Sequence, residues 1–352
     1  SLYADDPNYV PALYISEKFL LTKHPFHQHS EMQLFLAYQG NEIVGRIAAI
    51  HNTNYNQFNK KQDGFFGFFE CINNQKVADA LFSNAVEWLK LKNLSTIIGP
   101  VNPSTNETCG LLIDGFDTPP VVMMAYNPPY YQKLIEQFGF SNMTNLLAYE
   151  IKATQLDDKP VRLINTLKNR LVSKGITFRT VNINNFKNEV RSFKEVYNQA
   201  WDKNLGFVPM TDAEFYQMGK DAKMILDKEF CLVAEHEGRI VGFALAIPDI
   251  NQIQRKLKKG RLFPTGFLKI LLGKSKINTI RILALGVLED YRKLGIEAVF
   301  YGSIIQNGLK KNITTAEASW ILENNVMMNR AMQNINGNMY KKYSIFEKNI
   351  EA

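Results

Sequence analysis

Two stretches of the chain repeat one pattern of apolar and polar positions. LFLAYQGNEIVGRIAAI (34–50) and CLVAEHEGRIVGFALAI (231–247) each predict two strands rich in β-branched and aromatic residues, joined by a tight turn at Gly40 or Gly238. Gly45 and Gly242, and likewise Ile50 and Ile247, lie 197 positions apart. The pattern therefore predicts two matching hairpins.

A second pair of features keeps nearly the same offset. Asn127 precedes Gly139 by 12 positions, and Asn325 precedes Gly337 by the same 12, with an offset of 198 between the copies. A stretch of helical pattern lies between the members of each pair. Because two separated features stay in step, we infer that a whole domain has been duplicated.

Each copy shows the same order of elements: helices, hairpin, strand, helix, strand, helix. This order predicts an α/β fold with a mixed (α+β) sheet. After the hairpins we expect strands at 65–72, 95–98, 280–288 and 315–322, and helices at 75–92 and 296–309. Charged residues increase between residues 150 and 174, where the first copy ends, so we place the domains at 1–155 and 156–352.

Length and composition limit the number of domains and the cellular compartment. A length of 352 residues suits two domains, and 45% hydrophobic residues can bury a full core. The widely spaced Cys71, Cys109 and Cys231 form no Cys-x-x-Cys pair, which argues against disulfides and zinc and for a reducing, cytoplasmic setting. No apolar run reaches about 18 residues, and the first residues are polar rather than basic, so we expect neither a membrane span nor an export signal. The chain begins without Met, which is compatible with removal of an upstream segment.

The segment ILALGVLEDYRKLGIEAVFYGSII (282–305) combines a buried strand, a turn and a helix. The strand ends near Leu288, the turn contains Arg292 and Gly295, and the helix starts at once. A helix N-terminus offers free N–H groups and partial positive charge, and glycine lets the backbone approach a phosphate closely. The segment therefore predicts a pyrophosphate site.

This loop resembles the motif R/Q-x-x-G-x-G/A of the GNAT (GCN5-related N-acetyltransferase) superfamily, which binds the pyrophosphate of coenzyme A. The matching residues are Arg292, Lys293, Leu294, Gly295 and Ile296. Glu297 stands where Gly or Ala is usual and adds negative charge near the phosphate; alternatively it points away and Ala298 takes the small-residue role. An ordinary strand-turn-helix junction would account for the loop alone, whereas the duplication favours a tandem GNAT fold.

The resemblance extends over nearly the whole chain and is greatest to a two-domain bacterial GNAT-like family. The phrases that carry it are GFFGFFE (64–70), GPVNPS (99–104), YNPPYY (126–131) and SWILEN (319–324). The resemblance implies an acyl-CoA N-acyltransferase that uses acetyl-CoA or a longer acyl-CoA and no metal, and some relatives are implicated in acylating sphingoid bases. The first copy lacks glycine at 73–78, so we expect it to be a degenerate copy that serves as a structural lobe or acceptor wall.

By resemblance, the backbone of Leu285, Gly286 and Val287 would bind the pantetheine arm, and an N–H near Leu285 would stabilise the oxyanion. Glu317 and Glu323 are the candidate bases, although Glu323 could equally be a surface carboxylate. Met332 occupies the usual position of the tyrosine acid, so Tyr340 or Tyr301 would have to replace it. Asn325 would lie at the cofactor site or cap a helix.

The acceptor would be bordered by the loop at 198–211. Trp201, Asn204 and Phe207 are the candidate substrate-binding residues, and core packing is the alternative for Trp201. The segment 99–120 could reach the same cleft. Cys109 within it has no nearby His, which argues against a nucleophilic role.

Residues 254–276 form a basic insertion where a GNAT domain needs only a short turn. The segment has eight basic residues and no acidic one, interleaved with leucine, isoleucine and phenylalanine. This pattern is typical of a segment in an anionic membrane interface and favours a lipid amine acceptor over a small-molecule one. Alternatively the apolar residues cover the core, or the lysines contact the 3′-phosphate of coenzyme A. The net charge of +7 fits each of these, and no motif for nucleic acid accompanies it.

Two other functions stay open. Tandem GNAT-like enzymes include aminoacyl transferases, which need no coenzyme A loop, and Arg292 and Gly295 argue against this class. A non-catalytic acyl-CoA-binding protein is favoured by Glu297 and Met332. We expect a cytoplasmic acyltransferase, peripheral on the inner face of the membrane.

Overall fold

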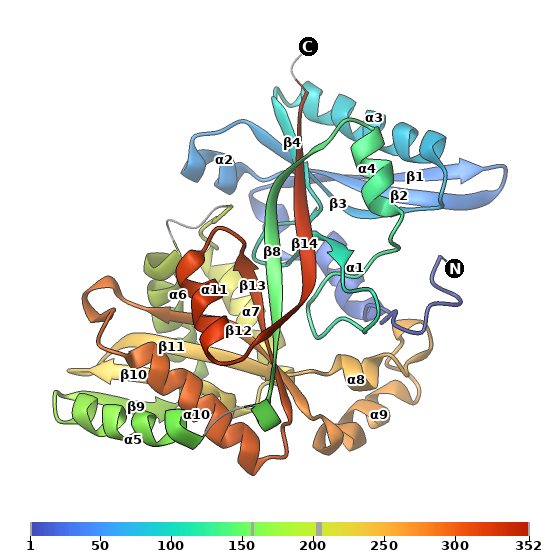
Figure 1. Cartoon of the computed structure of the whole chain (residues 1–352). Helices are drawn as coiled ribbons and strands as arrows, with labels where there is room; N and C mark the ends of the chain where they lie inside the picture. The colour runs from blue at the N-terminus through green and yellow to red at the C-terminus, as the bar shows by residue number, and fades with distance from the viewer. Residues whose placement is uncertain (1, 156–157, 202–205, 351–352) are drawn as a thin grey trace.

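One large sheet runs through the whole chain (Figure 1). The computed structural model describes residues 2–155, 158–201 and 206–350. The strands are β1 (Glu31–Gln39), β2 (Glu42–His51), β3 (Asp63–Cys71), β4 (Thr96–Gly99), β7 (Leu111–Asp114), β8 (Ser141–Lys152), β9 (Ile176–Thr180), β10 (Cys231–His236), β11 (Arg239–Pro248), β12 (Thr279–Val287), β13 (Thr315–Leu322) and β14 (Asn338–Asn349). A separate small sheet pairs β5 (Val101–Asn102) with β6 (Thr108–Cys109).

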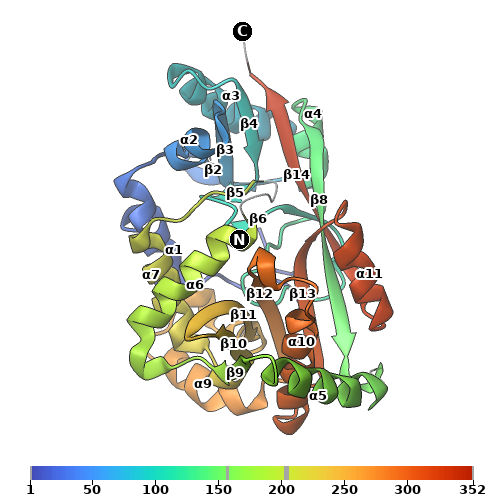
Figure 2. The same cartoon turned by 90° about the vertical axis from the view of Figure 1, so that its left-hand side faces the viewer.

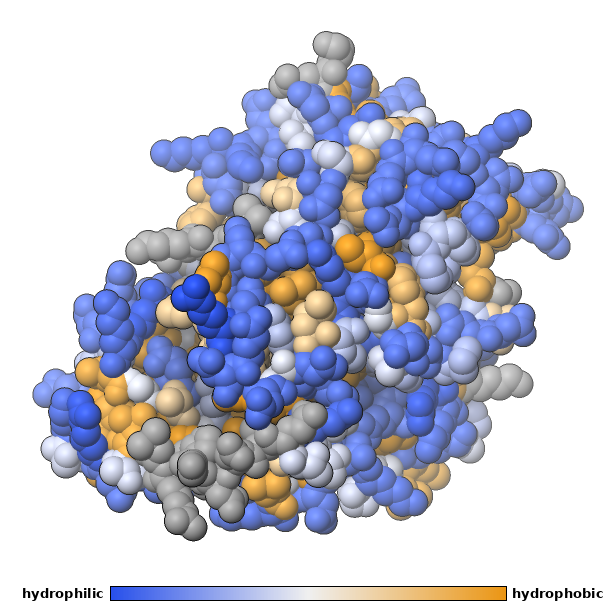
Figure 3. Space-filling view, viewed as in Figure 1, coloured by the Kyte–Doolittle hydropathy of each residue, from blue (hydrophilic) through white to orange (hydrophobic). Residues whose placement is uncertain are grey.

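The helices cover both ends of this sheet (Figures 1 and 2). They are α1 (Tyr14–Thr22), α2 (Thr53–Asn59), α3 (Gln75–Leu91), α4 (Tyr131–Gln137), α5 (Asp158–Val172), α6 (Phe186–Trp201), α7 (Asp212–Ile225), α8 (Asn251–Gln254), α9 (Gly266–Gly273), α10 (Ile296–Lys310) and α11 (Val326–Asn334). No helix in the described ranges is long and apolar enough to cross a bilayer. Hydrophilic side chains cover most of the face in Figure 3, with apolar patches between them.

The strand order is symmetrical about the middle of the sheet. The order is β1-β2-β3-β4-β14-β8-β13-β12-β11-β10-β9, with β7 also paired to β14. Each hairpin is followed by a strand and a parallel neighbour, so β3 pairs with β4 as β12 pairs with β13. The last strand of each copy has crossed to the other: β8 lies beside β13, and β14 lies beside β4. The prediction of a duplicated, mixed α/β sheet is confirmed.

Local sequence explains where the elements begin. Gly40 and Gly238 turn the hairpins at φ of 60° and 77°, a region open to glycine. Helix α3 begins after Asn74, whose side chain accepts the Lys76 N–H, and it buries an apolar face against the sheet. A capping box of Thr211 and Glu214 begins α7.

The two halves share a core. One buried cluster joins Phe65 and Leu146, from the first copy by sequence, with Val208 and Tyr343 from the second. Because β8 and β14 exchange sides, the centre of the sheet is built from both copies. A site at this centre can therefore draw residues from both.

Candidate functional site

Strands β12 and β13 separate in the middle of the sheet. They pair over four residues only, from Thr279↔Thr315 to Ile282↔Ala318. Beyond Ile282, β12 stays paired with β11 on its other side, and the register slips at Leu283. Bulges of this kind re-aim backbone groups beside functional sites. The backbone of Leu285, Gly286 and Val287 therefore lies beyond the paired part of β12 and β13.

Helix α10 begins at the end of this gap with an uncapped N-terminus. Gly295 is the N-cap residue with φ of 95°, and no side chain caps the first turn. Lys293 also has a positive φ, 67°. A Cβ added at Gly295 would lie 2.8 Å from the end of the Leu167 side chain of α5, and the positive φ itself favours glycine. Unsatisfied N–H groups at the start of a helix favour an anion.

Arg292 and Glu297 lie at the mouth of the gap. The Arg292 guanidinium donates to the carbonyls of Val287 (3.2 Å) and Ala200 (3.3 Å). Glu297 lines the same cavity as Arg292, whereas Ala298 is exposed. Glu297 therefore contributes to the wall of this cavity, and Ala298 does not. Burial, reinforced by the Glu297 charge, raises the pKa of the neighbouring Tyr301 to about 12.

A cavity of about 580 Å³, here called the apolar cavity, extends from this mouth into the first half. Leu285, Gly286, Val287, Arg292 and Asn325 line it, together with Trp201 and Phe207. Its lining from the other half includes Tyr55, Phe65, Ile98, Cys109 and Leu146. Lys293, Leu294, Gly295 and Ile296 are not among its lining residues, and Ile296 is fully buried in the core.

Trp201 and Phe207 close the apolar cavity on the side of α6. The Trp201 ring stacks on Tyr197 at 4.8 Å and lies so close to Gly286 that a Cβ there would overlap it. The Phe207 carbonyl accepts from Asn59 of the first half (3.1 Å). Trp201 thus packs in the core and lines the cavity at once. Asn204 lies outside the described residues.

The segment 99–120 reaches the apolar cavity beside residues 206–208. Thr105 and Asn106 donate to the carbonyls of Gly206 (2.7 Å) and Val208 (3.1 Å), and both line the apolar cavity. Cys109 is buried, and burial raises its pKa to about 12. A thiol with so high a pKa is a poor nucleophile.

Glu317 is the centre of a buried polar cluster. Its carboxylate accepts from Ser319 Oγ (2.5 Å) and from the Tyr340 hydroxyl, and it lies 3.9 Å from Arg281 Nε. Arg281 and Glu317 are each about 1% exposed. Burial raises the pKa of Glu317, and Arg281 opposes this rise. Burial and the Glu317 charge hold the pKa of Tyr340 above its usual value, so the hydroxyl keeps its proton.

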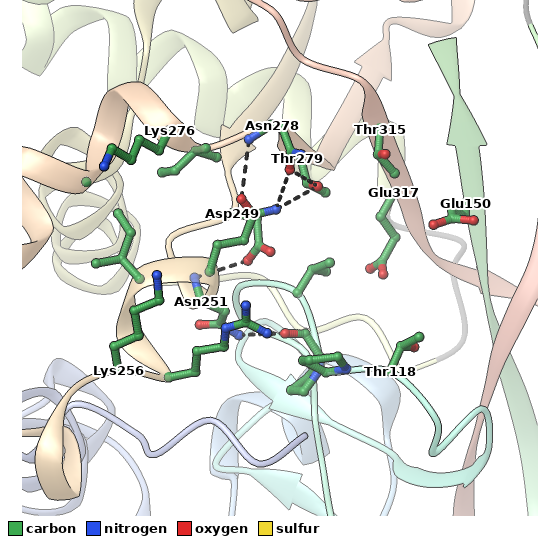
Figure 4. Close-up of a pocket in the computed structure, with 18 of the residues that line it drawn as sticks. Thr118, Glu150, Asp249, Asn251, Lys256, Lys276, Asn278, Thr279, Thr315 and Glu317 are labelled. Carbon is green, nitrogen blue, oxygen red and sulfur yellow. Dashed lines mark hydrogen bonds between the residues drawn. The ribbon is translucent and has the colours of Figure 1, made fainter. Parts of the chain in front are cut away.

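A second cavity of about 780 Å³, the polar cavity, opens on the other side of the cluster. Glu317 and Tyr340 line it, and Figure 4 shows the Glu317 carboxylate directed into this space. Asp249, Glu150, Asn251 and Thr279 contribute further polar groups. Arg281 and Ser319 line the apolar cavity instead. The Glu317 cluster therefore lies between an apolar and a polar cavity.

Comparison with known proteins agrees with this architecture. No family model matches the chain. It is 36% identical to Protein YghO of Escherichia coli (strain K12) over 99% of this chain and 90% of that protein. It is 33% identical to the bacterial ceramide synthase of Caulobacter vibrioides over 99% and 92%. A tandem GNAT protein from the clavulanic acid pathway superimposes with a TM-score of 0.55 at 9% identity, over 95% of this chain and 86% of that one.

The chain belongs to the family of Protein YghO and the bacterial ceramide synthase, and its fold is the tandem GNAT fold. In this GNAT chain the two candidate bases have different surroundings. Glu323 has a half-exposed side chain that pairs with Lys342 (2.8 Å) and accepts from Asn145 (2.7 Å). The Lys342 hydrogen bond holds the pKa of Glu323 below its usual value. Glu323 lines neither of the two cavities, so the geometry favours Glu317.

Asn325 and Tyr301 both line the apolar cavity. Asn325 caps α11, because its side chain accepts the Met328 N–H (3.2 Å). The helix-cap alternative is thus confirmed, and the same residue contributes to the cavity wall. In the described part of the GNAT chain, no three His, Cys, Asp or Glu side chains gather as a metal site requires.

The equivalent gap in the first GNAT copy is filled by the chain itself. Strands β3 and β4 also separate, after Phe65↔Ile98. The Asn102 side chain accepts the Phe68 N–H (2.7 Å), and the Val101 carbonyl lies against Gly67. Asn74 caps the helix that follows. In the first copy, residues 101 and 102 fill the gap between the strands and a side chain caps the following helix, whereas in the second copy the gap is open and the helix is uncapped.

Sequence reasoning missed Arg281, Ser319 and Lys341. Arg281 is a charged residue inside the apolar strand TIRILALGV, which is a signal of a buried ion pair. Glu317 and Ser319 alternate along β13 and so point to one face. Lys341 is fully buried and donates to the carbonyls of Gly115 and Thr118 (2.8 Å to the latter). No local pattern marks it.

Proposed function

We propose that this protein transfers an acyl group from acyl-CoA to the amine of a lipid, with a long-chain base as the preferred acceptor. The observation that carries the proposal is the position of Glu317 and its partners between the two cavities. One cavity would hold the acyl donor and the other would admit the acceptor. The name of the Caulobacter relative, a ceramide synthase, agrees with an acceptor of this class.

The donor side is supported by the gap beside β12. The uncapped start of α10 would bind the pyrophosphate, and Arg292 at the mouth would add positive charge. The backbone of Leu285, Gly286 and Val287 would bind the pantetheine arm. An acetyl group would leave most of the apolar cavity unfilled. Each methylene of a long acyl chain buried there would instead contribute about 0.8 kcal/mol of favourable transfer free energy. We therefore infer a long-chain acyl-CoA.

The reaction follows from the protonation states of the cluster. Glu317 in its ionised form takes a proton from the acceptor ammonium. The free amine attacks the thioester carbonyl, and a backbone N–H near Leu285 stabilises the oxyanion. As the C–S bond breaks, the proton of the attacking nitrogen moves to the leaving sulfur, which gives the amide and the free thiol of coenzyme A. Tyr340 holds its proton and donates a hydrogen bond to Glu317, which stabilises the ionised carboxylate. A lipid acceptor and a cytoplasmic donor place the reaction on the inner face of a membrane.

One observation favours a second function, that of a non-catalytic acyl-CoA-binding protein. Glu297 lines the mouth beside Arg292, where its negative charge opposes that of a phosphate. The aminoacyl-transferase alternative has no such support, because the open gap and uncapped helix would have no use without coenzyme A.

The deciding experiment measures binding and turnover separately. Calorimetry with acetyl-CoA and palmitoyl-CoA should show tighter binding of the long chain, and mass spectrometry should detect an N-acyl product with a long-chain amine. Glu317→Gln should keep binding but lose about 100-fold or more in kcat. Binding without product by the wild type would favour the non-catalytic function. No binding of either thioester would overturn both.

A further inference from the structure

Helix α9 and the residues before it present an apolar face to solvent. Phe263, Phe267, Leu268, Leu271 and Leu272 are between 53% and 75% exposed. Within the helix itself, Gly266 is the residue that is fully buried. Large apolar side chains clustered in this way on a short surface helix indicate an interaction site.

The basic residues around this face form no salt bridges among the described side chains. Seven basic residues of 254–276 have described side chains, and none of them pairs with a carboxylate within the described part of the chain. Lys269 and Lys274 reach only the carbonyls of Lys256 (3.5 Å) and Met224 (3.0 Å). The segment itself contains no acidic residue. An apolar face ringed by free cations is complementary to a bilayer with anionic headgroups.

The same segment forms one wall of the polar cavity. Lys256, Lys269, Leu272, Gly273 and Lys276 line it, and Figure 4 shows Lys256 and Lys276 on the side away from Glu317. Both overall views place α9 on the opposite side of the lower half from α5 and α10 (Figures 1 and 2). The route towards Glu317 from the α9 side is therefore separate from the mouth beside α10.

We propose that α9 docks on an anionic membrane and that the acceptor passes from the bilayer through the polar cavity to Glu317. The phenylalanine and leucine side chains enter the acyl boundary while the lysines contact the headgroups. Docking stands on the exposed surface alone, whereas the entry route rests on the proposed function. The donor reaches the cluster from the α10 side, so the two substrates do not share an entrance.

Sedimentation with vesicles tests docking without reference to activity. The wild type should bind phosphatidylcholine vesicles that contain phosphatidylglycerol and release them at high salt. Phe267→Ser with Leu271→Ser should abolish binding, and Arg261→Gln with Lys274→Gln should weaken it roughly 25-fold, since each charge contributes roughly five-fold. The control is Leu36→Ser with Tyr38→Ser, which removes exposed apolar side chains from β1. Equal binding by all variants, or equal loss in the control, would overturn docking.

Labelling at the cavity mouth tests the entry route. Asn278 is exposed and lines the polar cavity, and the three native cysteines are buried with raised pKa values, so a maleimide should react selectively with Asn278→Cys. The labelled variant should lose acylation of a vesicle-borne long-chain amine relative to its unlabelled form, while palmitoyl-CoA binding persists. Ser83→Cys, exposed on α3, is the matched control. Unchanged acylation after complete labelling would overturn the route. Absence of product before labelling would count against the proposed function instead.

Discussion

Replacing Arg281 by methionine would remove the positive charge nearest to Glu317. The two side chains are about 1% exposed, and Arg281 Nε lies 3.9 Å from the Glu317 carboxylate. Two unit charges at this distance interact by about 4 kcal/mol when the effective dielectric constant is about 20. Since this attraction favours the ionised carboxylate, the substitution should raise the pKa of Glu317 further above its already raised value.

A higher pKa of Glu317 should shift the pH dependence of the reaction rate in one direction. Glu317 acts as a base only when ionised, so kcat/KM should rise with pH through its pKa. In Arg281→Met the rising limb should move to higher pH, and in Arg281→Lys, which retains the charge, it should move much less. Breaking the buried pair should also lower the free energy of unfolding by about 3–5 kcal/mol.

The assay is acyl transfer to a water-soluble long-chain amine across the pH range, with circular dichroism at each pH to show that the variant is folded. A folded Arg281→Met with an unmoved limb would refute the assignment of Glu317 as the titrating base. If that variant does not fold, Arg281→Lys and Glu317→Gln keep the question open to measurement. Loss of the limb in Glu317→Gln alone would still support the assignment.

Three further changes test other contacts. Burial lowers the pKa of Lys341 to about 8, so the unfolded chain binds this proton more tightly than the folded chain does. The free energy of unfolding of the wild type, measured in urea, should therefore rise by about 3 kcal/mol relative to that of Lys341→Met between about pH 8 and pH 10.5. Parallel curves for the two proteins would contradict this. Gly286→Ala should lower the free energy of unfolding by about 1–3 kcal/mol because its Cβ overlaps Trp201, and this cost should shrink in a Trp201→Ala background; strict additivity would show that the two do not touch. Glu323→Gln should change stability by less than about 1 kcal/mol and leave kcat near that of the wild type, whereas a loss like that of Glu317→Gln would return Glu323 to the reaction.

The elements themselves were predictable from the sequence because their signals are local. The strand expected at 315–322 is β13, and the helix expected at 75–92 is α3, Gln75–Leu91. Alternation, capping residues and glycine turns lie within each segment. The exchange of β8 and β14 could not be predicted in this way, because each strand could equally have formed its backbone hydrogen bonds with strands of its own copy. Pairing partners are chosen by the whole sheet.

The strand, turn and helix around Gly295 were predictable for the same reason, and the Glu317 cluster was not. Strand, turn and helix around Gly295 are contiguous, so their chemistry is visible in one segment. The contact between Glu317 and Tyr340 joins β13 to β14, and Arg281 comes from β12. Burial of these charges depends on packing between the halves. A sequence shows that Arg281 is charged but not that Glu317 lies beside it.

The exchanged strand explains why the first copy is needed although its own gap is filled. Strand β14 carries Tyr340, Lys341 and Tyr343 into the Glu317 cluster. Its neighbours in the sheet are β4, β7 and β8, all from the first copy by sequence. Without them β14 would have unpaired edges, and β13 would lose β8 as well. The first copy therefore supports the strand that completes the site and lines both cavities, so its cofactor gap could be filled by Asn102 without loss of that role.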